Sequence, residues 1–116
     1  MRNVALVVLI LLAASPVRAD EIDPALVLAE AKPFRDAWER CAAGAVKALA
    51  PSARPAAAVA DLALARCRTQ ERALERKLAS GVGRASAARV MTVLRDSTRS
   101  SLVEVVARLR QRRSSR

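Results

Sequence analysis

The chain has 116 residues, no histidine and no tyrosine, and its 21 basic and 11 acidic side chains give a net charge of +10. Without histidine it lacks the usual general base and the commonest nitrogen ligand for metals. We therefore expect no catalytic site, no metal, no cofactor and no small-molecule substrate. With one phenylalanine and one tryptophan, the sequence also lacks the aromatic residues typical of β-strands. It predicts an all-α protein that is not an enzyme.

Residues 1–19 have the three parts of a cleavable export signal. A basic start is followed by an unbroken apolar run over 4–14, and Pro16 then precedes small residues up to Ala19, where we expect cleavage. An uncleaved membrane anchor is the alternative, but a helix needs about 20 apolar residues to cross a bilayer. The sequence therefore predicts an exported protein, periplasmic or secreted, whose residues 20–116 form a single domain.

Prolines and glycines divide the rest of the chain into helical segments. Three helices are predicted, over about 24–50, 56–79 and 85–111, with a frayed basic C-terminus after them. Asp23 is suited to cap the first helix, and Pro33 should break it, with a short leading piece over about 24–31 and then a kink or a restart before Phe34. Two prolines make 51–55 a loop, and Gly81 is well placed for a left-handed cap that ends the second helix.

Apolar residues recur every three or four positions in each segment, as in amphipathic helices. Phe34 and Trp38 are expected to form a core patch on the first helix. The other predicted core residues are Cys41, Ala45 and Leu49, then Val59, Ala63, Cys67, Leu74 and Leu78, and finally Val90, Met91, Leu94, Leu102, Val105 and Leu109. Because short links favour antiparallel neighbours, the predicted fold is a small antiparallel three-helix bundle: a helical hairpin plus a basic third helix.

Cys41 and Cys67 lie at similar distances from the 51–55 loop, on the predicted buried faces of the two helices that the loop joins. If these helices fold back on one another, the two cysteines come level, as a disulfide requires. Export would place them in an oxidising compartment where disulfides persist. We predict a Cys41–Cys67 bond, with two free buried cysteines as the alternative.

Positive charge is concentrated in the last third of the chain. Residues 20–80 hold ten basic and nine acidic side chains, whereas residues 81–116 hold nine basic and two acidic ones. The arginines that crowd the end of the third helix are Arg108, Arg110, Arg112, Arg113 and Arg116. Cations there suit the helix dipole, so a solvated helix end is one interpretation. We favour another, in which these arginines bind an anionic lipid surface or an acidic envelope protein.

Two other functions are compatible with a basic helix. The third helix could detach and insert at a membrane interface, which would make this a membrane-active cationic protein. Nucleic-acid binding is disfavoured, since no aromatic residue lies among the arginines to stack on bases. The predicted function is therefore that of an exported interaction protein of the cell envelope.

Overall fold

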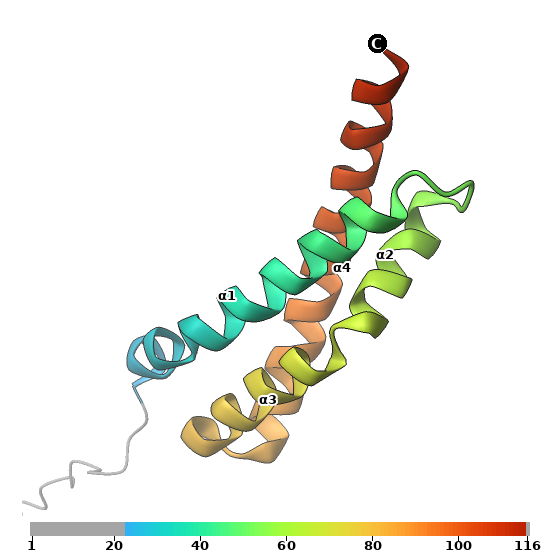
Figure 1. The fold of residues 1–116 in the computed structure, drawn as a ribbon. Helices are drawn as coiled ribbons and strands as arrows, with labels where there is room; N and C mark the ends of the chain where they lie inside the picture. Colours follow the sequence, from blue (N-terminus) through green and yellow to red (C-terminus); the bar gives the residue numbers. More distant parts are fainter. Residues whose placement is uncertain (1–22, 116) are drawn as a thin grey trace, which may run out of the picture.

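The computed structural model describes residues 23–115, and the expected export signal lies outside them. All regular structure in this part of the chain is helical, as predicted. Its four helices are α1 (Pro24–Leu49), α2 (Ala56–Arg66), α3 (Arg68–Val82) and α4 (Arg84–Ser114). Since α2 and α3 follow one another almost directly, they form one arm, and α1 and α4 both pack against it (Figure 1).

Pro33 does not divide the first helix, so the chain does not stop and restart there. α1 is a single helix of 26 residues that contains Pro33, and its start is capped by the Asp23 carboxylate, which accepts a hydrogen bond from the Ala25 N–H at 3.0 Å. An internal proline removes one backbone hydrogen bond and bends a helix without necessarily ending it. The first turns of α1 accordingly point in a different direction from the rest in Figure 1. Burial of Ala31 before the proline and Trp38 after it keeps both parts on the core.

The second predicted helix, over 56–79, is two helices. α2 ends and α3 begins at Cys67, whose backbone has φ −107° and ψ 25°, outside regular α-helix values. The Cys67 N–H bonds the Leu64 carbonyl oxygen three residues back, so the last turn of α2 tightens before the chain changes direction. The periodicity of the apolar residues continues through this break, which is why the sequence pattern did not reveal it.

The boundary between α3 and α4 also differs from the prediction. Gly81 is still helical, and Gly83 is the residue with positive φ, at 89°. Gly81 has another function: a Cβ there would lie 3.0 Å from a methyl group of Val27, so glycine permits close approach of α3 to α1. α4 persists to Ser114 instead of ending near 111, and the hydroxyl groups of Ser114 and Ser115 donate hydrogen bonds to the carbonyl oxygens of Arg110 and Gln111, four residues back.

The core is built mainly from small and aliphatic side chains of all four helices. Its buried members are Ala31, Trp38, Ala42, Val46 and Leu49 of α1, Val59, Ala60, Ala63 and Leu64 of α2, Leu74 and Leu78 of α3, and Ala87, Met91, Leu102 and Val106 of α4, together with Cys67. Trp38 is the largest, with no exposed surface. Alanines supply five of the sixteen buried members of this cluster, so Trp38 contributes a large share of its side-chain volume.

Phe34 is not part of this core, contrary to the prediction of a Phe34–Trp38 patch. Its side chain is 39% exposed, whereas Trp38 is fully buried. At 100° per residue, Phe34 lies about 60° to one side of Ala31 on the helix, while the buried line runs through Ala31, Trp38 and Ala42. A spacing of four residues places Phe34 and Trp38 on the same side of the helix. It does not show which of the two lies at the centre of the buried face.

Cys41 and Cys67 form the predicted disulfide. Their Cα atoms are 5.9 Å apart, and the bond closes a loop with a sequence separation of 26. Cys67 is fully buried and Cys41 partly buried within the hydrophobic cluster that includes Trp38. The bond joins α1 to the arm at the break between α2 and α3, so it fixes both the level of the hairpin and the point where the arm changes direction.

Cys41→Ser should lower the free energy of unfolding by about 3–4 kcal/mol, because closing a loop of this length restricts the unfolded chain. In a domain of this size the melting temperature should fall by about 10 °C or more. Thermal denaturation followed by circular dichroism measures this. The control is reductant, which should destabilise the wild-type protein and leave the variant unchanged; equal melting temperatures without reductant would contradict the expectation.

Gly83→Ala should destabilise the protein by about 1–3 kcal/mol, because φ 89° with ψ 162° is a region that side chains with a Cβ rarely enter. Gly44→Ala is the matched control. Gly44 lies exposed inside α1 with open space around it, so alanine there should stabilise the protein by about 1 kcal/mol through its higher helix propensity. Urea titration of both variants provides the comparison, and destabilisation by the Gly44 substitution would show that helix propensity does not govern that site.

Candidate functional site

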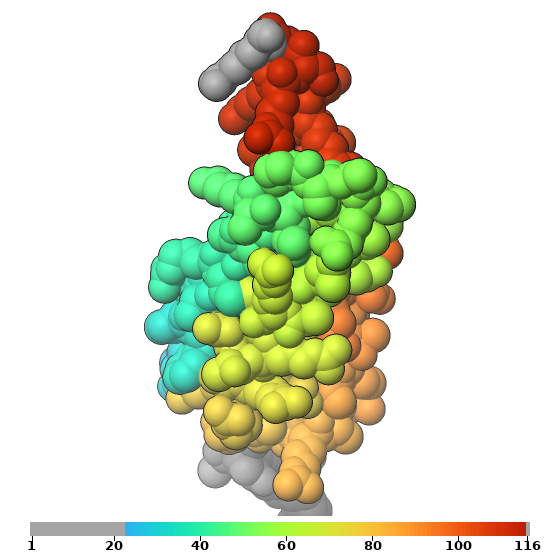
Figure 2. Space-filling model, turned by 45° about the vertical axis from the view of Figure 1, so that its right-hand side comes forward, coloured from blue at the N-terminus to red at the C-terminus, as the bar shows by residue number. Residues whose placement is uncertain are grey.

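α1 and α4 end at the same pole of the molecule, beside the loop that leads into α2. Arg110 connects the end of α4 to this loop. Its guanidinium donates hydrogen bonds to three carbonyl oxygens of the loop: Ala50 at 3.0 Å, Ser52 at 3.0 Å and Arg54 at 2.6 Å. Beyond the loop, the last turns of α4 project from the rest of the molecule (Figures 1 and 2).

Arg110 therefore differs from the other arginines predicted to bind an anionic surface. The carbonyls at a helix end and in the following loop have no partners within the helix, and a cation that reaches them supplies hydrogen bonds and offsets their partial negative charge. Arg110 is partly buried by these contacts. Its donors face the loop, so we assign it a structural part in positioning the end of α4.

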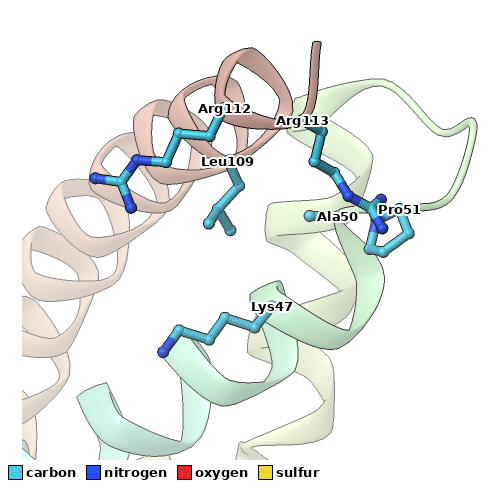
Figure 3. A pocket seen from close by; sticks show the side chains of 6 residues that line it. All are labelled: Lys47, Ala50, Pro51, Leu109, Arg112 and Arg113. Atoms are coloured by element: carbon cyan, nitrogen blue, oxygen red, sulfur yellow. The ribbon is translucent and has the colours of Figure 1, made fainter. Parts of the chain in front are cut away.

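The other cations at this end are exposed and form a surface that we call the basic pole. It comprises Lys47, Arg54, Arg108, Arg112 and Arg113, all exposed. Figure 3 shows Lys47 and Arg112 on opposite sides of Leu109, with Arg113 reaching toward Pro51. These five residues and Ala50 line a hollow of about 310 Å³. Arg116, also predicted to bind, lies outside the described residues.

No acidic side chain belongs to the segments that build the basic pole. Residues 48–60 and 105–115 contain neither aspartate nor glutamate, and no ion pair involves the five cations in the part of the chain that the structure describes. Cationic side chains gathered without carboxylates produce a positive potential at the surface. The pole can therefore attract anionic groups through charge and hydrogen bonds, with Leu109 and Pro51 offering apolar contact between them.

Arginines earlier in α4 are used differently, because acids of the α2–α3 arm pair with them. Arg95 donates to Glu71 of α3 at 2.7 Å, and Arg99 donates to Asp61 of α2 at 2.6 Å. The hydrogen bond from Arg99 holds the pKa of the Asp61 carboxyl below its usual value. These pairs connect the middle of α4 to the arm, whereas the cations of its last turns form no ion pair among the described residues.

Sequence reasoning identified the arginines of α4 but missed Lys47 and Arg54. Each is an isolated cation, seven residues from the nearest other one along the chain, so it does not stand out as part of a basic cluster in the sequence. The signal lay in the topology: a hairpin followed by a third helix brings the ends of the first and third helices together. Lys47, in the last turn of α1, and Arg54, in the next loop, then join the α4 cations.

No family model, curated protein or solved structure matches the chain. Over residues 23–115 there is no cluster of acidic and cysteine side chains arranged to hold a metal ion. None of the helices in this region has the length and apolar character required to cross a membrane. The basic pole and the surfaces around it are the candidate site.

Arg110→Ala should lower the free energy of unfolding by about 2 kcal/mol, since hydrogen bonds from a charged donor to partly buried carbonyls are lost. Arg112→Ala, which removes the same charge from an exposed position, should change stability by less than about 0.5 kcal/mol. Urea titration compares the two. Equal effects would mean that the contacts of Arg110 with the loop contribute nothing beyond a surface charge.

Proposed function

We propose that this chain is an exported, non-enzymatic helical interaction protein of the cell envelope that docks on anionic surfaces through its basic pole. The antiparallel three-helix bundle, pinned by its disulfide, is the scaffold in this proposal. The observation that carries it is the gathering of five exposed cations, from α1, the following loop and α4, none of which forms an ion pair among the described residues. The disulfide is compatible with export to an oxidising compartment.

The number of cations exceeds what the helix ends require. Two helices end at the pole, and cations near their C-termini offset the helix dipoles. Arg110 already bonds three carbonyls there, so the other side chains remain available to a partner. Each arginine or lysine close to an anionic bilayer contributes about 1 kcal/mol, and salt weakens the attraction. Five such residues support reversible docking.

The alternative is a membrane-active protein whose last helix detaches and inserts. The packing of α4 disfavours it: Ala87, Met91, Leu102 and Val106 are buried in the core, and two arginines of this helix pair with acids of the arm. Detachment would expose these side chains and break both ion pairs. Docking through the pole needs no such rearrangement. Leakage of a dye from anionic vesicles would favour the alternative.

The test is co-sedimentation with vesicles. Wild-type protein should bind vesicles with anionic lipid more strongly than neutral ones, and binding should decrease as salt rises. The triple variant Arg108→Gln/Arg112→Gln/Arg113→Gln keeps the Arg110 contacts with the loop and should bind about 100-fold more weakly, as three contributions of about 1 kcal/mol imply.

A matched control removes the same charge elsewhere. Arg66, Arg68 and Arg72 are exposed on the α2–α3 arm, and replacing all three by glutamine should weaken vesicle binding much less. If both triple variants bind equally, net charge alone governs the attraction. If the wild-type protein shows no preference for anionic vesicles, the pole is a solvated helix end.

A further inference from the structure

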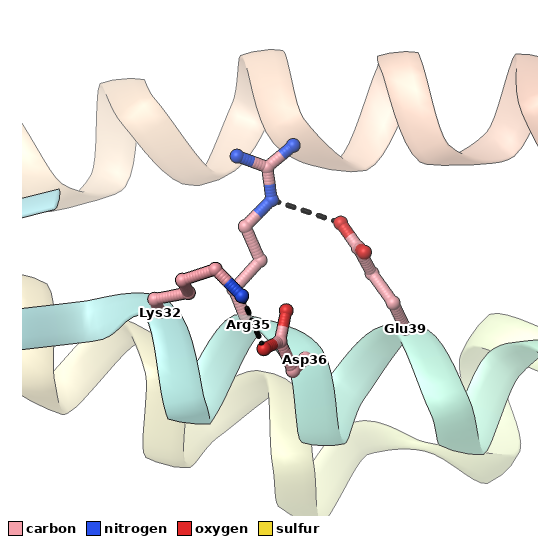
Figure 4. A network of polar contacts seen from close by, with 4 residues as sticks. All are labelled: Lys32, Arg35, Asp36 and Glu39. Carbon is pink, nitrogen blue, oxygen red and sulfur yellow. Dashed lines mark hydrogen bonds and ion pairs between the residues drawn. The ribbon is translucent and has the colours of Figure 1, made fainter. Parts of the chain in front are cut away.

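The hollow of the basic pole is lined by cations without an acid to neutralise them. Earlier on α1, cations are paired one turn further along: Lys32 bonds Asp36 and Arg35 bonds Glu39, each at 2.8 Å (Figure 4). Two other hollows beside α1 include one or both of these carboxylates in their linings. None of the six residues that line the hollow at the pole is acidic, so an anionic group that enters it meets uncompensated positive charge.

The cations of this hollow stand on different sides of it. In Figure 3, Lys47 and Arg112 lie on opposite sides of Leu109, and Arg113 extends in another direction, next to Pro51. Lys47 belongs to α1 and the two arginines to α4. Because successive residues of an α-helix point about 100° apart, Arg112 and Arg113 reach the hollow from different directions. An anionic group inside it is therefore approached by donors from several sides.

Between the cations, the lining of the hollow is apolar. Ala50 is buried, Leu109 is half-buried, and Pro51 completes this part of the surface. Apolar walls keep water away from part of a bound group, and hydrogen bonds from charged donors strengthen where the local dielectric constant falls. The volume of about 310 Å³ lies at the low end of the range for small-ligand sites, about 300–1,000 Å³. The hollow therefore has room for one small anionic group and its nearest atoms.

Arg110 holds the two walls of the hollow together. Its hydrogen bonds to the carbonyl oxygens of Ala50, Ser52 and Arg54 join the end of α4 to the loop that follows α1. One wall carries Lys47, and the other carries the two arginines of α4. Since the walls are already joined in the free protein, binding does not have to bring them together, and preorganisation of this kind lowers the free-energy cost of binding.

Cations on several sides of one hollow favour a phosphate monoester over the other anionic groups of an envelope surface. A monoester has about −1.5 to −2 charges near pH 7 and three terminal oxygens that diverge from the phosphorus atom. A carboxylate has a single charge and two oxygens that lie in one plane. A phosphodiester also has a single charge, and two of its four oxygens are tied up in ester bonds. Of these groups, only the monoester provides one acceptor oxygen for each cation of the hollow.

We infer that the hollow binds a phosphate monoester, with Lys47, Arg112 and Arg113 each donating to one of its terminal oxygens. The inference rests on the proposed function, since it uses the same pole, and it adds the chemical class of the ligand. Arg54 and Arg108 belong to the pole but do not line the hollow, so they attract any anion without distinguishing its kind. The monoester has two sources, a lipid head group and a free phosphate ester.

Co-sedimentation with two anionic lipids tests this. Phosphatidylcholine vesicles contain either phosphatidic acid, a monoester, or phosphatidylglycerol, a diester, in proportions that give equal zeta potentials. The wild-type protein should bind the monoester vesicles about tenfold more strongly, as one additional hydrogen bond from a charged donor implies. Equal binding to both lipids would overturn the inference and leave the proposed function intact. Equal binding to anionic and neutral vesicles would contradict the proposed function as well.

Soluble glycerol 3-phosphate distinguishes the two sources of the monoester. It is added at constant ionic strength to protein bound on phosphatidic acid vesicles. Displacement of the protein would show that a free ester fills the hollow. Binding that persists, together with the preference for the monoester lipid, would identify the lipid head group as the ligand. Either result supports the inference, because both require recognition of the monoester.

Arg113→Gln and Arg108→Gln are matched variants, because each removes one exposed arginine of α4 and only Arg113 lines the hollow. Each should weaken binding to either lipid about fivefold through the lost charge. Arg113→Gln should also reduce the ratio of monoester binding to diester binding to about one, whereas Arg108→Gln should keep the ratio of the wild-type protein. A ratio that is the same in both variants would overturn the hollow as the site of recognition.

Discussion

A covalent bond between Cys41 and Cys67 holds α1 against the α2–α3 arm at the point where the arm changes direction. This disulfide sets how far α1 is shifted along the arm, and the positions of the other contacts between them depend on that shift. Above the disulfide, α1 reaches the loop that Arg110 of α4 holds by three carbonyl oxygens; below it, Gly81 lets α3 approach Val27. A small alanine-rich core provides little shape selectivity on its own, so a fixed covalent register compensates for the shortage of large side chains.

The charged residues fall into two groups with different physical consequences. Arg95 and Arg99 pair with acids on the neighbouring arm and fix α4 in place. The cations of the basic pole have no such partners among residues 23–115, and their mutual repulsion is tolerated because they point into water. Part of α4 is thus paired with its own chain, and the last turns of the same helix leave their cations exposed. This division along α4 allows a basic surface without weakening the fold.

The all-α class, the loop after α1 and the disulfide could be predicted, because apolar periodicity, paired prolines and the level of two cysteines are local signals. The continuity of α1 through Pro33 could not, since burial on both sides of the proline outweighs its cost within the helix. Nor could the break at Cys67, where the apolar spacing continues across a change of direction. For the site, the arginines of α4 were visible in the sequence, but the use of Arg110 in the loop and the arrival of Lys47 and Arg54 depend on three-dimensional neighbours.

Trp38 has a consequence for how the molecule can be observed. It is the sole tryptophan, it is fully buried, and its indole N–H has no hydrogen-bond partner in the described part of the chain. Its emission therefore originates in the core, where Trp38 belongs to the same hydrophobic cluster as Cys41 and Cys67. A ligand that occupies the surface should leave the emission wavelength unchanged, whereas opening of the core should shift it to the red. One optical signal can thus distinguish an intact folded complex from a protein that has come apart on contact with its target.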